Sequence, residues 1–152
     1  MRLWCPAWLL TGKETGSVID VRVDGGKLRV RLAGWDAFAV CWRSSWQWEV
    51  PVAKIVRVYV RPARPAVPLR SRTHWGPKLP ELRRVRAGLP SLWVDICAEK
   101  HQRLAVSSTD ADDLAAQIAG TGIPVKIRHG EPGPLSPSDV SRLATGEFTR
   151  GD

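Results

Sequence analysis

The chain has few of the residues that build metal sites and disulfide frameworks. Among its 152 residues the cysteines and histidines are Cys5, Cys41, Cys97, His74, His101 and His129. No two cysteines form a CxxC pair, and no histidine has a cysteine or carboxylate beside it at ligand spacing. We therefore expect no metal site, no cofactor and no disulfide framework, and a reducing, cytoplasmic setting.

Catalytic motifs are missing as well. No GxGxxG or phosphate-binding P-loop occurs, and Ser44-Ser45 and Ser107-Ser108 lack the context of a nucleophile elbow. Asp110, Asp112 and Asp113 lack the glycine and terminal glutamate of a calcium loop. The sequence thus predicts a protein that is not an enzyme and has no catalytic residues.

A long apolar run is also absent from the N-terminal stretch. Residues 1–10, MRLWCPAWLL, contain one early arginine and are interrupted by Pro6. They are too short for a membrane-spanning helix and carry no clear small-residue cleavage site. We expect neither a transmembrane segment nor a secretion signal.

Acidic residues are in the minority. Lys and Arg number 23 against 15 Asp and Glu, a formal net charge of +8. Between Lys54 and Arg86 basic residues outnumber acidic ones by ten to one, with Glu81 as the exception. This balance favours an anionic partner, which is a nucleic acid, a phospholipid surface or an acidic protein. For the 54–86 stretch a solvated loop is an equally good interpretation.

Alternation of apolar and polar residues is what the sequence has in abundance. From Phe38 to Val60 it has a period of two, which is typical of antiparallel strands with one buried face. Trp42, Trp46 and Trp48 share the apolar parity, so they are expected in the core rather than in a binding platform. Trp75 is a better candidate for exposure.

A hairpin is predicted around Gly25-Gly26, because two glycines suit a primed two-residue turn. Pairing outward from that turn places Val23 opposite Leu28, Val21 opposite Val30 and Ile19 opposite Leu32. A further strand is expected over Val56, Val58 and Val60, with Arg57, Tyr59 and Arg61 on its other face. A second hairpin is expected over Leu92–Ile96 and Leu104–Val106, turning at residues 99–102.

One helix is predicted near residues 110–119. Thr109 is its expected N-cap, the aspartates that follow suit the helix dipole, and Leu114 and Ile118 form an apolar stripe with Ala111 and Ala115. Val125 and Ile127 suggest a short edge strand. We divide the chain into an N-terminal segment (1–14), a domain (15–128) with a basic insertion at about 61–90, and a mobile tail (129–152).

Three stretches resemble the small bacterial proteins of the pleckstrin-homology-like (PH-like) family. They are Gly25-Gly26 leading to Leu28-Arg29-Val30, residues 48–58 (WEVPVAKIVRV), and residues 103–114 (RLAVSSTDADDL). The resemblance covers about residues 15–120 and implies a mainly β fold: a bent antiparallel barrel or roll of six to seven strands, capped by one C-terminal helix. A simple β-sandwich with the helix on one edge is the competing architecture. The family implies no common reaction, and some members bind phosphoinositides through a basic first hairpin.

Three functions stay open. The first is an interaction module that binds a protein partner through arginine and tryptophan, the second is docking to an anionic membrane surface, and the third is nucleic-acid binding through residues 54–86. The candidate anion- or partner-binding residues are Lys27, Arg29, Arg31, Arg57, Arg61, Arg64, Arg70, Arg72, Trp75, Arg83, Arg84 and Arg86.

Overall fold

The computed structural model describes residues 17–34, 37, 45–63, 81–85, 88–121, 125–130 and 132–148. Strands β1 (Ser17–Asp24) and β2 (Lys27–Gly34) form the predicted hairpin. Its turn glycines have φ angles of 58° and 74°, which side chains disfavour. The pairing of Val23 with Leu28 and of Val21 with Val30 confirms the predicted register.

Strand β3 (Ser45–Pro51) pairs with β2 and completes a three-stranded antiparallel sheet in the order β1-β2-β3. Trp46 and Trp48 are partly buried. They pack against the main core, the large cluster of buried apolar residues to which β2 contributes Leu28, Val30 and Leu32. The prediction that they belong to the core face is confirmed, whereas Trp42 lies outside the described residues. A short 3-10 helix, η2 (Val52–Lys54), leads from β3 to the second sheet.

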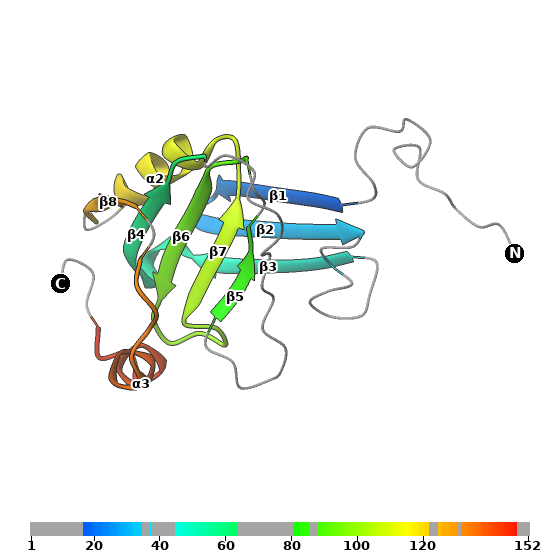
Figure 1. Cartoon of the computed structure of the whole chain (residues 1–152). Helices are drawn as coiled ribbons and strands as arrows, with labels where there is room; N and C mark the ends of the chain where they lie inside the picture. Colours follow the sequence, from blue (N-terminus) through cyan, green and yellow to red (C-terminus); the bar gives the residue numbers. More distant parts are fainter. Residues whose placement is uncertain are drawn as a thin grey trace, which may run out of the picture.

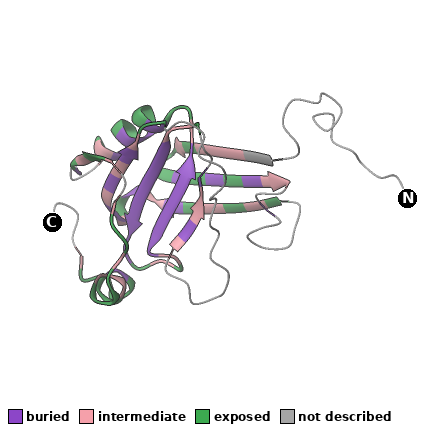
Figure 2. Cartoon of the chain, in the orientation of Figure 1, coloured by how far each residue is buried: buried purple, intermediate pink, exposed green. Residues whose placement is uncertain are grey.

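The second sheet has five strands in the order β5-β7-β6-β4-β8. They are β4 (Ile55–Arg61), β5 (Glu81–Arg84), β6 (Ser91–Ile96), β7 (Arg103–Ser107) and β8 (Ile127–His129). The central pairs β4·β6 and β6·β7 are antiparallel, as expected, and β6 and β7 are buried along their length (Figure 2). The outer pairs β5·β7 and β4·β8 are parallel, so the sheet is mixed at both edges, where the predicted barrel or roll is mostly antiparallel.

Strand β5 lies inside the stretch that the sequence indicated as a long connection. It was missed because only Leu82 of its residues is buried, and one apolar residue gives no readable period. Strand β8 confirms the predicted edge strand near Ile127.

Strand β4 contains a one-residue register shift. Ile55 pairs with Ile96 and Arg57 with Asp95, so Val56 is the extra residue of a bulge. Val56 therefore does not share the main core with Val58 and Val60, as the plain alternation predicted, and packs with Cys97 and Leu143 instead.

Helix α2 (Ala111–Ala119) confirms the predicted helix, and its four predicted apolar residues are buried. The N-cap is Asp110 rather than Thr109, because the helix begins one residue later than expected. Ala111, Leu114, Ala115 and Ile118 join the main core, and the helix contacts β1 of one sheet and β4, β6 and β8 of the other.

A second helix, α3 (Pro137–Thr145), lies within the stretch predicted to be a mobile tail, residues 129–152. Ser136 caps it by accepting a hydrogen bond from the Asp139 N–H, and Gly146 ends it in the left-handed conformation. Leu143 is fully buried against Val56 and Cys97, so this part of the predicted mobile tail forms a helix that packs on the rest of the molecule.

The molecule is thus mainly β, with two sheets that enclose the main core and α2 across one end (Figure 1). The strands of the three-stranded sheet run across those of the five-stranded sheet, and the strands that the structure describes do not close into a barrel. The described residues form eight strands and the helices α2 and α3, rather than six to seven strands and one helix.

Candidate functional site

Alternation along β4, β6 and β7 gives the five-stranded sheet two different faces. Val58, Val94 and Leu104 point into the main core, and the residues between them point the other way. We call this second side the outer face. Its principal side chains are Arg57, Tyr59, Arg61, Glu81, Arg83, Trp93, Asp95, Arg103, Ala105 and Arg128.

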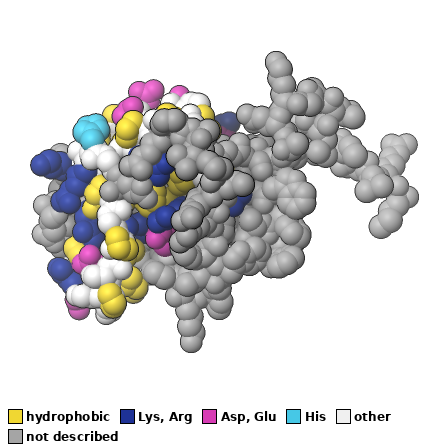
Figure 3. Space-filling model, in the orientation of Figure 1, with side chains coloured by type: hydrophobic (Ala, Val, Ile, Leu, Met, Phe, Trp, Pro, Cys, Tyr) yellow, Lys and Arg dark blue, Asp and Glu magenta, His cyan; other side chains and the backbone are white. Residues whose placement is uncertain are grey.

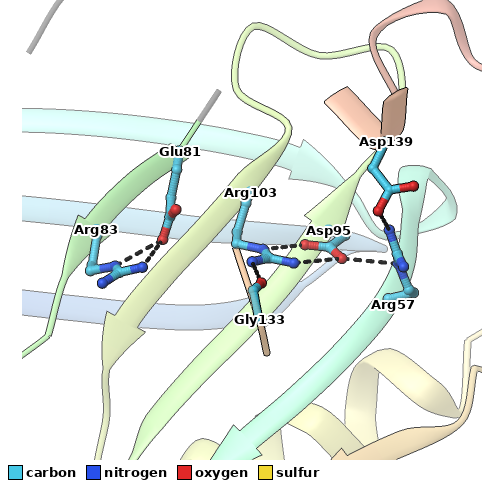
Figure 4. Close-up of polar contacts among 7 residues, drawn as sticks. All are labelled: Arg57, Glu81, Arg83, Asp95, Arg103, Gly133 and Asp139. Atoms are coloured by element: carbon cyan, nitrogen blue, oxygen red, sulfur yellow. Dashed lines mark hydrogen bonds and ion pairs between the residues drawn. The ribbon is translucent and has the colours of Figure 1, made fainter. Parts of the chain in front are cut away.

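One row of the outer face alternates in charge from strand to strand. The register aligns Glu81 of β5, Arg103 of β7, Asp95 of β6 and Arg57 of β4, and we call these four residues the charge row (Figure 4). The Arg103 Nε and Nη2 atoms donate to the two carboxylate oxygens of Asp95 at 2.6 and 3.2 Å. Arg57 Nε approaches the same carboxylate at 3.0 Å.

Burial makes two members of this row, Asp95 and Arg103, depend on each other. Asp95 is fully buried and Arg103 is 2% exposed, so neither charge is solvated by water. Each is compensated by ionic hydrogen bonds, and Arg103 Nη1 also donates to the Gly133 carbonyl at 2.6 Å. The positions of the guanidinium groups are therefore fixed by the carboxylate between them.

The next row combines arginine with aromatic rings. The register runs from Arg83 of β5 through Ala105, Trp93 and Tyr59 to Arg128 of β8, and we call these five residues the aromatic row. The Arg83 guanidinium carbon lies 4.7 Å from the Trp93 ring centre, and that of Arg128 lies 5.8 Å from the Tyr59 ring centre. These are cation–π distances.

Glu81 holds the stacked Arg83 in place. Its Oε1 atom accepts from Arg83 Nε at 2.8 Å and lies 2.6 Å from Nη2 (Figure 4). The Trp93 ring is buried, and its Nε1 atom donates a hydrogen bond to the Ser91 hydroxyl at 2.8 Å. This bond fixes the orientation of the ring on which Arg83 stacks. The outer face thus holds guanidinium groups in fixed orientations beside aromatic rings. Of these side chains Arg128 is exposed, Arg83 and Tyr59 are partly exposed, and Trp93 is buried.

The basic residues of the first hairpin are arranged differently. Lys27, Arg29 and Arg31 are exposed on the outside of the three-stranded sheet. Glu49 lies 3.7 Å from Lys27 and 3.2 Å from Arg29, and Asp24 lies 3.6 Å from Arg29. Carboxylates offset much of the hairpin's positive charge, which weakens it as an anion site.

The structure brings together only some of the predicted site residues. Arg57, Arg61 and Arg83 lie on the outer face, and Arg84 lies on β5 next to Arg83. The hairpin residues lie on the other sheet. Arg64, Arg70, Arg72, Trp75 and Arg86 lie outside the described residues.

Sequence reasoning missed Asp95, Arg103 and Arg128. A weak indication was present, since Asp95 interrupts an apolar strand and Arg103 begins the next one. In the structure Asp95 pairs with Arg103, so the β6·β7 hairpin is centred on Glu99. The predicted turn, residues 99–102, has its centre further along the chain and would not pair these two charges. That shift of register was not readable from the hydrophobic pattern.

In the described part of the chain, no group of three or more His, Cys, Asp or Glu residues is placed to hold a metal ion. None of the helices described there is long and apolar enough to cross a membrane. Comparisons of the chain with protein-family models, with curated proteins and with solved structures give no match.

Proposed function

We propose that the chain is a non-enzymatic, PH-like interaction module that binds a protein partner through the outer face. The observation that carries the proposal is the aromatic row, in which Arg83 and Arg128 stack on Trp93 and Tyr59. Arginine and tyrosine are among the residues that dominate binding energy at protein interfaces, and the buried Trp93 ring supports the partly exposed Arg83. The Arg128 guanidinium is exposed and lies over the Tyr59 ring, and a guanidinium group can bind a partner's carboxylate in a bidentate manner.

The distribution of charge favours a protein over a uniformly anionic surface. Basic side chains lie next to acidic and hydrophobic ones on the side of the molecule that carries β4 and β8 (Figure 3). On the outer face, arginines from β4, β5, β7 and β8 alternate with rings and carboxylates rather than forming an unbroken basic patch. A protein surface offers the same mixture of groups, whereas lipid headgroups and a phosphate backbone offer mainly negative charge.

The experiment is affinity capture from native lysate with identification by mass spectrometry. We expect one or more specific proteins with the unmodified chain and their loss with Arg83→Ala plus Arg128→Ala. The matched control is Arg22→Ala plus Arg31→Ala, which removes the same charge from exposed positions on the other sheet. Thermal unfolding of both variants verifies that each remains folded.

Two results would contradict the proposal. One is equal capture by both double variants, which would place the interaction elsewhere on the molecule. The other is the recovery of no specific protein from a chain that turns over a substrate. Anionic vesicles and single- or double-stranded oligonucleotides are tested in parallel, and strong binding to either would favour the corresponding alternative.

A further inference from the structure

The chain places its own C-terminal segment, residues 132–148, against one end of the outer face. After β8 this segment runs along the five-stranded sheet to α3 (Figure 1). Three hydrogen bonds attach it: Arg103 Nη1 to the Gly133 carbonyl at 2.6 Å, the Ala98 N–H to the Leu143 carbonyl at 2.8 Å, and the Cys97 thiol to the Phe148 carbonyl at 3.4 Å.

Arg57 is the side chain that the segment engages by charge and by ring. Arg57 Nη2 lies 3.8 Å from Asp139 Oδ2, so Asp139 extends the charge row by one carboxylate (Figure 4). The Arg57 guanidinium carbon also lies 4.7 Å from the Phe148 ring centre. Arg142 stacks on the same ring at 4.1 Å. The segment thus offers Arg57 a carboxylate and an aromatic ring together.

This attachment depends on few buried groups. Helix α3 has nine residues, and Leu143 is its one buried residue. So short a helix is marginal without tertiary contacts, and elements with few buried contacts open before the rest of a protein does. Few buried contacts therefore have to be broken for the segment to leave the sheet while the main core stays folded.

We infer that the C-terminal segment is an internal ligand of the outer face. The partner is then a protein segment of the same chemistry, which presents a carboxylate and a neighbouring aromatic ring to Arg57 and displaces residues 132–148. This inference rests on the proposed function and specifies what the partner must offer. Because the internal ligand closes the site in part of the molecules, the apparent affinity for the partner equals the affinity of the open form multiplied by the fraction of molecules that are open.

The test uses a fluorescent synthetic peptide of residues 132–148 as the probe and the full-length chain as the receptor. In the receptor, Asp139→Ala plus Phe148→Ala removes the two groups that meet Arg57 and leaves the main core intact. We expect this opened receptor to bind the peptide about tenfold more tightly than the unmodified chain does, because its own segment competes less. Receptor Ser141→Ala, an exposed position on α3, is the matched control and should behave like the unmodified chain.

Two further changes locate the binding. The roughly tenfold gain in peptide affinity should disappear when Arg57→Ala is added to the opened receptor. It should also disappear when the peptide itself carries Asp139→Ala plus Phe148→Ala. Hydrogen exchange of residues 132–148 reports whether the segment has opened, and Leu143→Asp provides a second opened receptor if the first stays closed.

Equal peptide binding by opened and unmodified receptors would overturn the inference, as would binding that does not depend on Arg57. Binding of the opened receptor to anionic vesicles but not to the peptide would overturn it as well. The proposed function fails separately: peptide binding without any captured protein would refute the partner but not the internal ligand. Capture of a protein that depends on Arg83 and Arg128 but not on Arg57 would refute the internal ligand and leave the proposed function intact.

Discussion

Asp95 is the penultimate residue of β6, whose other side chains are apolar or hydroxylic, and its carboxylate forms ion pairs with Arg57 and Arg103. A buried carboxylate of this kind fixes the positions of its arginine partners but adds little net stability, because the cost of desolvating the buried charges offsets their attraction. Its partners were not predictable from the sequence. Arg57 was singled out as a cation, but its relation to Asp95 depends on the bulge in β4 and on the register of the β6·β7 hairpin.

Replacement of Asp95 by alanine should destabilise the protein strongly. Arg103 would remain buried without its counter-charge, and the loss of one partner of a buried pair costs about 3–5 kcal/mol in the free energy of unfolding. Urea denaturation measures this change. Asp24→Ala, which removes an exposed carboxylate paired with Arg29, is the control and should cost less than about 1 kcal/mol. Equal effects of the two substitutions would show that the charge row has no special role.

At the scale of elements, local chemistry decided what could be predicted. The β1·β2 hairpin was predictable to the register because its turn glycines and its alternating residues agree. Helix α2 was predictable because its buried residues recur at helical spacing. Strand β5 and helix α3 were not, since each buries a single leucine and is held mainly by what it packs against. Of the candidate site, the arginines of β4 and β5 were predicted, but their carboxylate and aromatic neighbours were not.

The hairpin turn offers a test of backbone conformation. Gly26→Ala forces a side chain into a left-handed backbone with φ of 74°, which should cost about 1–2 kcal/mol in the free energy of unfolding. Gly133→Ala is the matched control, because its backbone is not left-handed and an added Cβ meets nothing within 4 Å. Chemical denaturation of both variants measures the difference. Similar stabilities would mean that the turn adopts a different conformation in solution.

Helix α2 should act as a structural cap. Ile118 is fully buried, and its replacement by alanine leaves a cavity where both sheets meet the helix, so we expect a loss of about 2–5 kcal/mol. Gln117→Ala, at the neighbouring exposed position, should change stability by less than about 0.5 kcal/mol. Thermal and urea unfolding provide the measurement. A small effect of Ile118→Ala would argue against the capping role.

For the molecule as a whole, the contacts indicate two levels of stability. The main core unites both sheets with α2, whereas α3 belongs to a separate small cluster with Val56 and Cys97. We therefore expect the C-terminal segment to open on its own, and the core to unfold as one cooperative unit.

Two amides with hydrogen bonds of equal length test this expectation. The Ala98 N–H donates to the Leu143 carbonyl of α3 at 2.8 Å, and the Ile96 N–H donates to the Gln102 carbonyl within the β6·β7 hairpin at 2.8 Å. The Ala98 amide should exchange with solvent at least about tenfold faster, with little dependence on denaturant, since only α3 has to leave. Nuclear magnetic resonance in low urea measures both. The same rate and denaturant dependence at the two sites would make α3 part of the cooperative core.

The bulge in β4 has a consequence for changes in chain length. Because Val56 is the extra residue, Ile55 and Arg57 lie two positions apart and yet serve opposite faces, Ile55 the main core and Arg57 the charge row. A deletion of Val56 would join Ile55 directly to Arg57, and regular alternation would still place Ile55 in the main core and Arg57 in the charge row. What would be lost is the local distortion of the bulge and the side chain that packs with Cys97 and Leu143, so this deletion should loosen α3 more than the main core. A deletion of Val58, by contrast, would make two outer-face residues neighbours in the chain and would turn one of them toward the core. Among these positions of β4, Val56 is therefore the one at which the strand can be shortened without exchanging its two faces.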